Sequence, residues 1–104
     1  MESVIFYITC KDKNEAEKIG KTLVEERLAA GANVLREITS FFWWKGKINE
    51  AKEAALILKT KKGLAQDLIN RVKELHSYEC PCIIALPIIE GSKDFLNWIC
   101  EETK

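Results

Sequence analysis

The sequence predicts a single α+β domain over residues 1–104, in the ferredoxin-like order β-α-β-β-α-β with an extra C-terminal helix. Three observations support this. Short β-branched and aromatic runs alternate with amphipathic stretches. No linker rich in proline, glycine or serine interrupts them, and the length suits one domain. Finally, Lys45-Gly46-Lys47 places a glycine between two long strand-like segments, as in a hairpin turn.

The N-terminal third predicts one strand and one helix. Residues 3–10 are β-branched and aromatic, which favours a strand. Asp12 and Glu15 have the spacing of a capping box, so a helix is expected to begin there. Apolar residues at helical intervals extend this helix to about Ala30, and Gly31 is expected to be its left-handed C-cap.

The remaining elements are predicted from the same signals. Residues 33–44 and 48–60 form the two strands of the hairpin. Residues 62–75 carry leucine and valine on one helical face and predict the second helix. A fourth strand covers residues 82–89, where Pro87 suits an edge strand, and a short helix follows it.

The predicted strands are apolar on both faces. Right-handed crossovers place the two main helices on one face of a four-stranded antiparallel sheet. Each strand should then alternate apolar and polar residues, because the other face of the sheet meets water. Residues 54–58 and 83–86 are instead apolar throughout. We therefore expect this other face to be buried in a homo-oligomer. The alternative is a monomer whose last helix and hairpin fold back over the sheet.

Composition excludes several partners. Sixteen basic and sixteen acidic residues give a formal net charge of zero, so neither a nucleic acid nor a membrane surface is an expected partner. The aromatic run over residues 41–44 is assigned to an oligomer interface rather than to base stacking. The N-terminus lacks signal-peptide features and no segment is long enough to span a bilayer. We expect a cytoplasmic protein with free thiols.

Motifs of catalysis are not found in the sequence. It has no glycine-rich phosphate loop and no serine elbow, and its one histidine excludes a two-histidine zinc motif. No catalytic residues and no required cofactor are therefore predicted, and the protein is not expected to be an enzyme.

One histidine and three cysteines form the first candidate site. Cys80 and Cys82 are two residues apart, so both thiols would face one side of an extended chain. Antiparallel pairing of the first and last strands would bring Cys10 near them, with His76 just upstream. Thiolate and imidazole suit copper or another borderline divalent metal ion. The alternative is that these are ordinary buried thiols.

The second candidate is a polar cleft between subunits, near the hairpin and the second helix. Its expected members are Trp44, Glu53, Lys59, His76, Tyr78 and Glu79. Such a set could bind a small anion or a metal–anion complex. The alternative is a structural network in which Lys59 pairs with a carboxylate and Tyr78 bonds across the interface.

Several segments resemble the CutA family of divalent-cation tolerance proteins. They are residues 26–30 (ERLAA), 42–48 (FWWKGKI), 58–60 (LKT) and 76–81 (HSYECP). The resemblance covers nearly the whole chain and implies a ferredoxin-like subunit, related in architecture to the PII signalling proteins, in a homotrimer. It also implies a role in copper or divalent-cation tolerance. The alternative function is a PII-like regulatory module that binds a small ligand between subunits.

The sequence departs from the family pattern at a few positions. Gly31 stands where the family usually has cysteine, and Ser77 where it usually has proline. The resemblance implies a copper site that some family members build from a first-strand cysteine and two adjacent histidines. The matching positions here are Ile8, Leu75 and His76, so one of those three ligands is retained.

Overall fold

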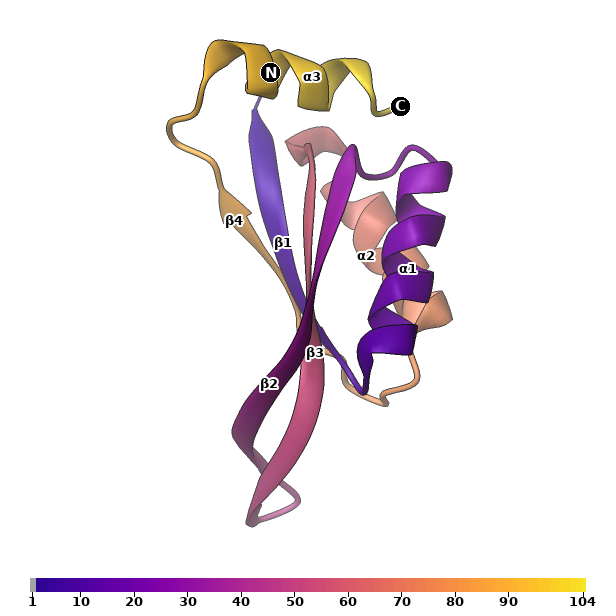
Figure 1. The fold of residues 1–104 in the computed structure, drawn as a ribbon, viewed down its shortest axis with the longest axis vertical. Helices are drawn as coiled ribbons and strands as arrows, with labels where there is room; N and C mark the ends of the chain where they lie inside the picture. The colour runs from indigo at the N-terminus through magenta and orange to yellow at the C-terminus, as the bar shows by residue number, and fades with distance from the viewer. Residues whose placement is uncertain (1) are drawn as a thin grey trace.

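The computed structural model describes residues 2–104 and contains the elements in the predicted order (Figure 1). The strands are β1 (Ser3–Cys10), β2 (Gly31–Trp44), β3 (Lys47–Lys61) and β4 (Ile83–Pro87). The helices are α1 (Lys13–Glu25), α2 (Ala65–Leu75) and α3 (Lys93–Glu101), and a short 3-10 turn, η1 (Lys62–Leu64), precedes α2. The strand order is β2-β3-β1-β4 and every pair is antiparallel. The ferredoxin-like prediction is confirmed.

The core lies between the sheet and the two main helices, which pack side by side on one face (Figure 1). The fully buried large side chains here are Phe6, Ile8, Ile19, Leu23, Leu56, Leu58, Leu68 and Val72. Gly20 marks the closest approach of α1 to the sheet, because a Cβ there would lie 2.9 Å from Leu56 Cδ1. The absence of a side chain at Gly20 therefore sets the spacing between α1 and β3.

The first helix is shorter than predicted. It ends at Glu25, and Arg27 rather than Gly31 takes the left-handed conformation, with φ 62°. The apolar residues beyond the helix, such as Leu28, are still buried, so their spacing resembled a continuing helical stripe. Gly31 instead begins β2 and leaves room for Trp98 of α3, whose Cη2 would lie 3.2 Å from a Cβ at this position.

The second half of the chain follows the prediction with small shifts at the ends of elements. β4 covers only part of the predicted 82–89, and it pairs with β1 alone, so its position at the sheet edge is confirmed. Pro87 is its last residue; a proline has no N–H to donate to a neighbouring strand. Ser92 then caps α3, because its Oγ accepts a hydrogen bond of 3.4 Å from the Phe95 N–H.

β2 and β3 continue beyond the rest of the sheet as a long two-stranded hairpin (Figure 1). Lys45 and Gly46 form its turn, with φ values of 52° and 80°. Positive φ at both turn residues matches a type I′ turn, whose twist suits the strands that it joins. The pairing of β2 with β3 is irregular between Leu35 and Ile38, as expected for a β-bulge.

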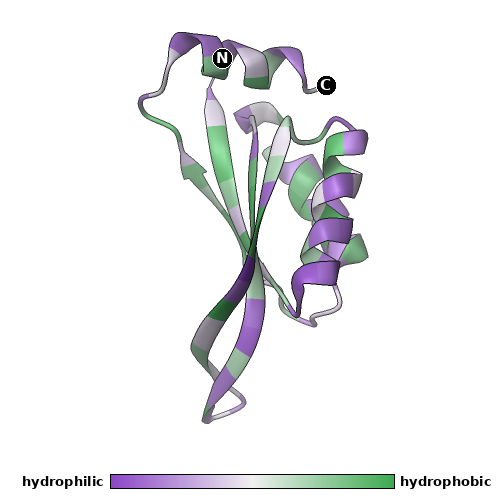
Figure 2. Cartoon of the chain, viewed as in Figure 1, coloured by the Kyte–Doolittle hydropathy of each residue, from purple (hydrophilic) through white to green (hydrophobic). Residues whose placement is uncertain are grey.

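The sheet face opposite α1 and α2 remains largely uncovered in the single chain. Leu35, Ile84 and Leu86 are each about half exposed on it, at 49%, 51% and 48%. Beyond the sheet, the long hairpin also exposes Phe41 and Trp43, at 68% and 72%. In Figure 2 the projecting hairpin carries isolated green, hydrophobic segments among purple, hydrophilic ones, and α3 crosses only one end of the sheet (Figure 1). The hairpin thus extends away from the sheet and α3 covers only one end of it, whereas the monomer alternative required both to fold back over this face.

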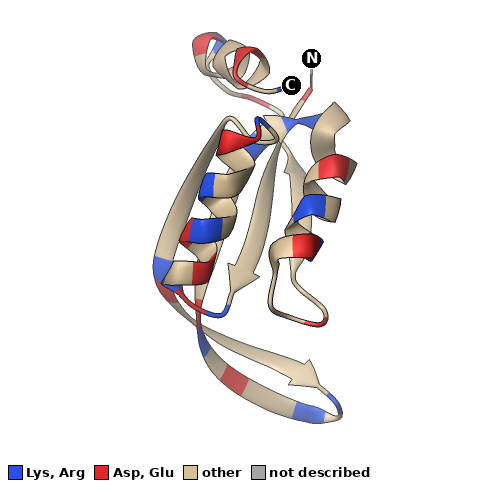
Figure 3. Ribbon diagram, turned by 90° about the vertical axis from the view of Figure 1, so that its right-hand side faces the viewer, with Lys and Arg blue, Asp and Glu red and all other residues tan. Residues whose placement is uncertain are grey.

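Charged residues of both signs alternate along the outer surfaces of α1 and α2 (Figure 3). Lys13 and Glu17 form an ion pair of 2.9 Å one helical turn apart. Arg71 of α2 reaches Glu26, just beyond α1, at 2.8 Å, and so ties the two helices together. Over residues 2–104, none of the helices has the length and apolar character needed to cross a membrane.

Candidate functional site

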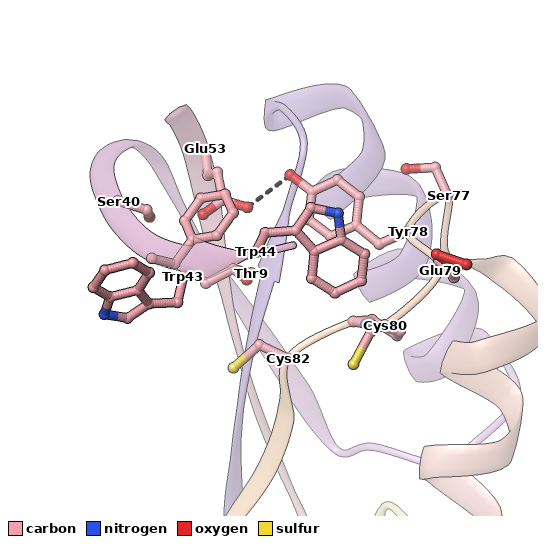
Figure 4. A pocket seen from close by; sticks show the side chains of 12 residues that line it. Thr9, Ser40, Trp43, Trp44, Glu53, Ser77, Tyr78, Glu79, Cys80 and Cys82 are labelled. Atoms are coloured by element: carbon pink, nitrogen blue, oxygen red, sulfur yellow. Dashed lines mark hydrogen bonds between the residues drawn. The ribbon is translucent and has the colours of Figure 1, made fainter. Parts of the chain in front are cut away.

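A pocket of about 830 Å³ opens where the hairpin meets the loop between α2 and β4 (Figure 4). Its lining residues are Thr9, Ser40, Phe42, Trp43, Trp44, Glu53, Ser77, Tyr78, Glu79, Cys80, Pro81 and Cys82. Four of the six predicted cleft residues are among them: Trp44, Glu53, Tyr78 and Glu79. The described lining contains two carboxylates and two thiols but no lysine or arginine.

A hydrogen bond connects the two sides of the pocket. Tyr78, from the loop, donates its hydroxyl to Oε2 of Glu53, from β3, at 2.6 Å (Figure 4). Glu53 is only 6% exposed, so this donor compensates a carboxylate that is largely removed from water. Burial and the nearby Glu53 carboxylate both raise the pKa of Tyr78, because they disfavour the phenolate. The phenol therefore stays protonated and remains a donor.

His76 lies behind the pocket and does not line it. It follows the last turn of α2 and is buried. Its Nδ1 accepts a hydrogen bond of 3.1 Å from the Tyr78 N–H, so the proton is on Nε2, which donates to the Thr9 carbonyl at 2.8 Å. The ring packs beside Tyr78 with centroids 4.9 Å apart. His76 thus positions Tyr78 and joins the loop to the end of β1.

Glu15 fixes the start of the same loop. Its N–H donates to Asp12 Oδ1 at 2.9 Å, as the predicted capping box requires, while its Oε1 accepts from the Lys11 N–H at 2.9 Å. The other carboxylate oxygen accepts from the Ser77 N–H at 2.9 Å. Burial acts to raise the pKa of Glu15, but the hydrogen bonds from Ser77 and Lys11 outweigh it and hold the pKa below its usual 4.5.

The structure separates the four predicted metal ligands into two pairs. Cys10 and His76 lie together with Glu15, and their ligand atoms are all within 4.8 Å of one another. We call these three residues the inner cluster. Cys80 and Cys82 are exposed and lie in the pocket wall instead. Cys10 belongs to the core between β1 and the helices. Cys80 and Cys82 instead line the pocket beside the hairpin, so the two pairs have different surroundings.

The chemistry of the inner cluster fits a metal ion poorly. Both ring nitrogens of His76 and both carboxylate oxygens of Glu15 already take part in hydrogen bonds within the protein. Burial, followed by the effect of nearby carboxylates, raises the pKa of Cys10 to about 12, so this thiol is protonated at neutral pH. Binding a metal ion here would require displacement of the thiol proton and of the hydrogen bonds that His76 and Glu15 make within the protein.

Lys59 does not line the pocket of the single chain; its predicted place in a cleft between subunits stays a prediction. It lies six residues beyond Glu53 on β3, about 20 Å along an extended strand. Its neighbours across the sheet are Ile5 and Gly31, and its Nζ donates to Asn33 Oδ1. An even spacing of six residues places Lys59 and Glu53 on the same face of β3, but at a distance that prevents both side chains from lining one pocket.

Sequence reasoning missed part of the site. Thr9 and Ser40 line the pocket without belonging to a recognisable motif, and Phe42 was assigned only to the aromatic run of an oligomer interface. Glu15 was predicted only as part of the capping box of the first helix, and this pattern is the one sequence signal that marks it. Its contact with Ser77 joins residues 62 positions apart, which a local pattern does not reveal.

The fold and the pocket define a class of protein: a small ferredoxin-like α+β protein with a ligand-sized pocket at the base of a long hairpin. A family profile described as CutA1 divalent ion tolerance protein matches residues 4–102. The divalent-cation tolerance protein CutA of Pyrococcus horikoshii is 50% identical over 101 residues, which are 97% of this chain and 98% of that protein.

Solved structures agree. The periplasmic divalent cation tolerance protein CutA from Archaeoglobus fulgidus matches with a TM-score of 0.95 and 46% identity, covering 98% of this chain and 99% of that one. CutA1 from Oryza sativa matches with a TM-score of 0.97 and 35% identity, covering 100% of this chain and 95% of that one. The chain belongs to the CutA1 divalent ion tolerance family, as the sequence motifs indicated.

Proposed function

We propose that this protein is a non-enzymatic, metal-binding member of its family, and that the pocket binds copper or another divalent cation. The observation that carries this proposal is the charge of the pocket. Glu53 and Glu79 contribute carboxylates and Cys80 and Cys82 contribute thiols, while the described lining has no basic side chain. Such a surface attracts a cation and repels an anion.

The two pocket carboxylates are also not neutralised from outside the pocket. Among the ion pairs formed within residues 2–104, none includes Glu53 or Glu79. Lys59, which was expected to supply positive charge, lies elsewhere on β3. A small anion is therefore a less suitable ligand than the sequence suggested, and a cation a better one.

Calorimetric titration with Cu(II) and Zn(II) tests the proposal. Glu53→Gln and Glu79→Gln each remove a negative charge with little change of shape, and each should weaken binding by about tenfold or more. Glu90→Gln is the matched control, because Glu90 is exposed and lies outside the pocket lining. Equal affinity in all three variants and the unmodified protein, or no binding to any of them, would refute a cation site in this pocket.

The proposal includes assembly into a homotrimer through the uncovered sheet face. The support is the exposed apolar set on that face, together with the hairpin aromatics, because soluble monomers rarely leave such a surface open. Light scattering should give about three times the 11.9 kDa chain mass. A mass near that of one chain at micromolar concentration would contradict it.

A PII-like regulatory module that binds a small molecule is the second candidate function. The pocket volume of about 830 Å³ favours it, since small-molecule sites span about 300–1,000 Å³, and Phe42 and Trp44 offer apolar walls. A thermal-shift screen with nucleotides and small metabolites tests this candidate. Stabilisation by such a compound should be lost in Trp44→Ala. If it is retained, the compound binds elsewhere.

We propose the cytoplasm as the location, with no nucleic-acid or membrane partner. The four cysteines are free, two of them exposed, which suits a reducing compartment. The Archaeoglobus fulgidus relative is described as periplasmic, so the location needs a direct test. Cell fractionation should recover the protein with cytoplasmic markers, and recovery with periplasmic or secreted markers would refute this assignment.

A further inference from the structure

We propose that the side chains of His76 and Glu15 form a proton-sensitive latch on the loop after α2, and that protonation of His76 releases the part of the pocket wall that Tyr78 forms. The inference goes beyond the proposed function, because it concerns the loop itself and holds for any ligand of the pocket. The latch belongs to the inner cluster and is built within one chain, so it does not depend on what covers the open sheet face.

Titratable side chains hold two consecutive backbone N–H groups of this loop. The Ser77 N–H donates to Glu15 Oε2 at 2.9 Å, and the Tyr78 N–H donates to His76 Nδ1 at 3.1 Å. The Tyr78 hydroxyl then donates to Glu53 Oε2 at 2.6 Å, across the pocket (Figure 4). The protonation states of His76 and Glu15 therefore decide how firmly this wall of the pocket is held.

The two hydrogen bonds of the His76 ring require a neutral imidazole. Nε2 lies 2.8 Å from the Thr9 carbonyl, which can only accept, and Nδ1 lies 3.1 Å from the Tyr78 N–H, which can only donate. A ring with one proton, on Nε2, satisfies both partners. A second proton makes Nδ1 a donor that faces another donor, so the bond to Tyr78 is lost.

Glu15 offers the protonated ring a different partner. The ligand atoms of Glu15 and His76 lie within 4.8 Å of each other. A histidine ordinarily takes up its proton between about pH 8 and 5, where Glu15 is still a carboxylate because its pKa lies below its usual 4.5. The carboxylate attracts an imidazolium, and it must then share its oxygens with the Lys11 and Ser77 N–H groups. Protonation therefore removes the Tyr78 bond and weakens the Ser77 bond together.

Other titratable groups surround the ring on the adjoining elements. Cys10 of β1 stays a neutral thiol, because burial and then the nearby carboxylates raise its pKa to about 12. Burial and the carboxylate of Glu53, on β3, raise the pKa of Tyr78, which stays a neutral phenol. The remaining charged side chains of the adjoining segments are exposed, where water and salt screen them: Lys11, Asp12, Lys73, Glu74 and Glu79. Of the whole set, a histidine is the side chain that ordinarily changes charge between pH 5 and 8.

NMR on the unmodified, metal-free protein tests the inference. His76 is the one histidine of the chain, so the imidazole signals report its protonation without ambiguity. Amide hydrogen exchange is measured in parallel from pH 8 to 5 and corrected for the intrinsic effect of pH on exchange. Protection of the Tyr78 amide should fall by about tenfold or more as the ring takes up its proton. The Leu58 amide, in the middle of β3, should keep its protection, since the change is local.

Three variants separate the latch from a general effect of acid. His76→Asn keeps a short side chain with an acceptor oxygen but takes up no proton, so Tyr78 protection should be the same at pH 5 and 8. Glu15→Gln removes the carboxylate that attracts the imidazolium, so the change should occur at a lower pH. Glu17→Gln is the matched control: Glu17 lies on the same helix but is 49% exposed and pairs with Lys13, so the change should stay where it was.

Constant protection of the Tyr78 amide while the ring takes up its proton would overturn the inference. So would a ring that stays neutral down to pH 5 in the folded protein, or a loss of protection that persists in His76→Asn. The first two outcomes are read from the unmodified protein, so the test remains decisive even if His76→Asn does not fold.

Discussion

Replacing Tyr78 with phenylalanine removes one oxygen atom and with it the hydrogen bond across the pocket. Oε2 of Glu53 would lose its donor, now at 2.6 Å, while the aromatic ring and its packing on His76 remain. The carboxylate is 6% exposed, so it would stay largely buried without that partner. Tyr78→Phe should therefore destabilise the fold and loosen the loop that forms one wall of the pocket.

The magnitude follows from the kind of hydrogen bond that is lost. A bond to a charged group contributes about 1.5–3 kcal/mol to stability, and an unpaired buried charge costs at least as much. Because the pocket beside Glu53 admits water, the effect should stay within this range rather than exceed it. For a domain of this size, 1 kcal/mol corresponds to a fall in Tm of roughly 4–8 °C.

Denaturant unfolding measures the change in free energy directly, at one fixed protein concentration. Tyr7→Phe is the matched control, because Tyr7 lies on β1 and its hydroxyl has no hydrogen-bond partner among the described residues. Adding Glu53→Gln completes a double-mutant cycle, which isolates the interaction from other effects of each change. A Tyr78→Phe effect no larger than that of Tyr7→Phe would refute the importance of this bond.

Three further predictions concern packing, pH and thiol chemistry. Gly20→Ala should destabilise the fold by about 1–3 kcal/mol in denaturant unfolding, because the alanine Cβ would overlap the sheet, and this outweighs the better helix propensity of alanine. Gly63→Ala is the control: no atom lies within 4 Å of a Cβ at that position, so this change should be close to neutral. Glu15 has a lowered pKa in the folded state, so its stabilisation is complete above about pH 4.5 and is lost as the pH falls through the folded pKa. The stability difference between the unmodified protein and Glu15→Gln should accordingly shrink in acid, and a constant difference from pH 7 to 3 would contradict this. In native protein at pH 8, Cys10 should react with a thiol reagent far more slowly than the exposed thiols, since its pKa is about 12, and at a comparable rate only after unfolding.

Much of the fold could be predicted because its signals are local. The capping residue Asp12, the glycine turn at Gly46 and the edge proline Pro87 each act within a few residues, and all three occupy the predicted positions. The end of α1 was wrong because burial continues past the helix. Leu28 is buried from a loop, and its spacing alone does not distinguish that loop from another helical turn.

The candidate site was predicted in part. Glu53 and Tyr78 were placed together correctly, and they meet at 2.6 Å. Lys59 does not line the same pocket, because it lies six residues farther along β3; its place in a cleft between subunits stays a prediction. His76 was expected to hold a ligand, but it does not line the pocket. Its Nδ1 instead accepts a hydrogen bond from the backbone N–H of Tyr78 and so holds Tyr78 in place.

The sequence by itself determined the order of elements, the family and the apolar character of both sheet faces, because these depend on residue type and short spacings. Only the tertiary structure decided which chemical groups share an environment. Cys10 and Cys82 are 72 positions apart and both were candidate ligands, yet one faces the core and the other the pocket. Strand pairing and helix packing assign each side chain to one face of the sheet, and that assignment depends on contacts between segments far apart in the chain.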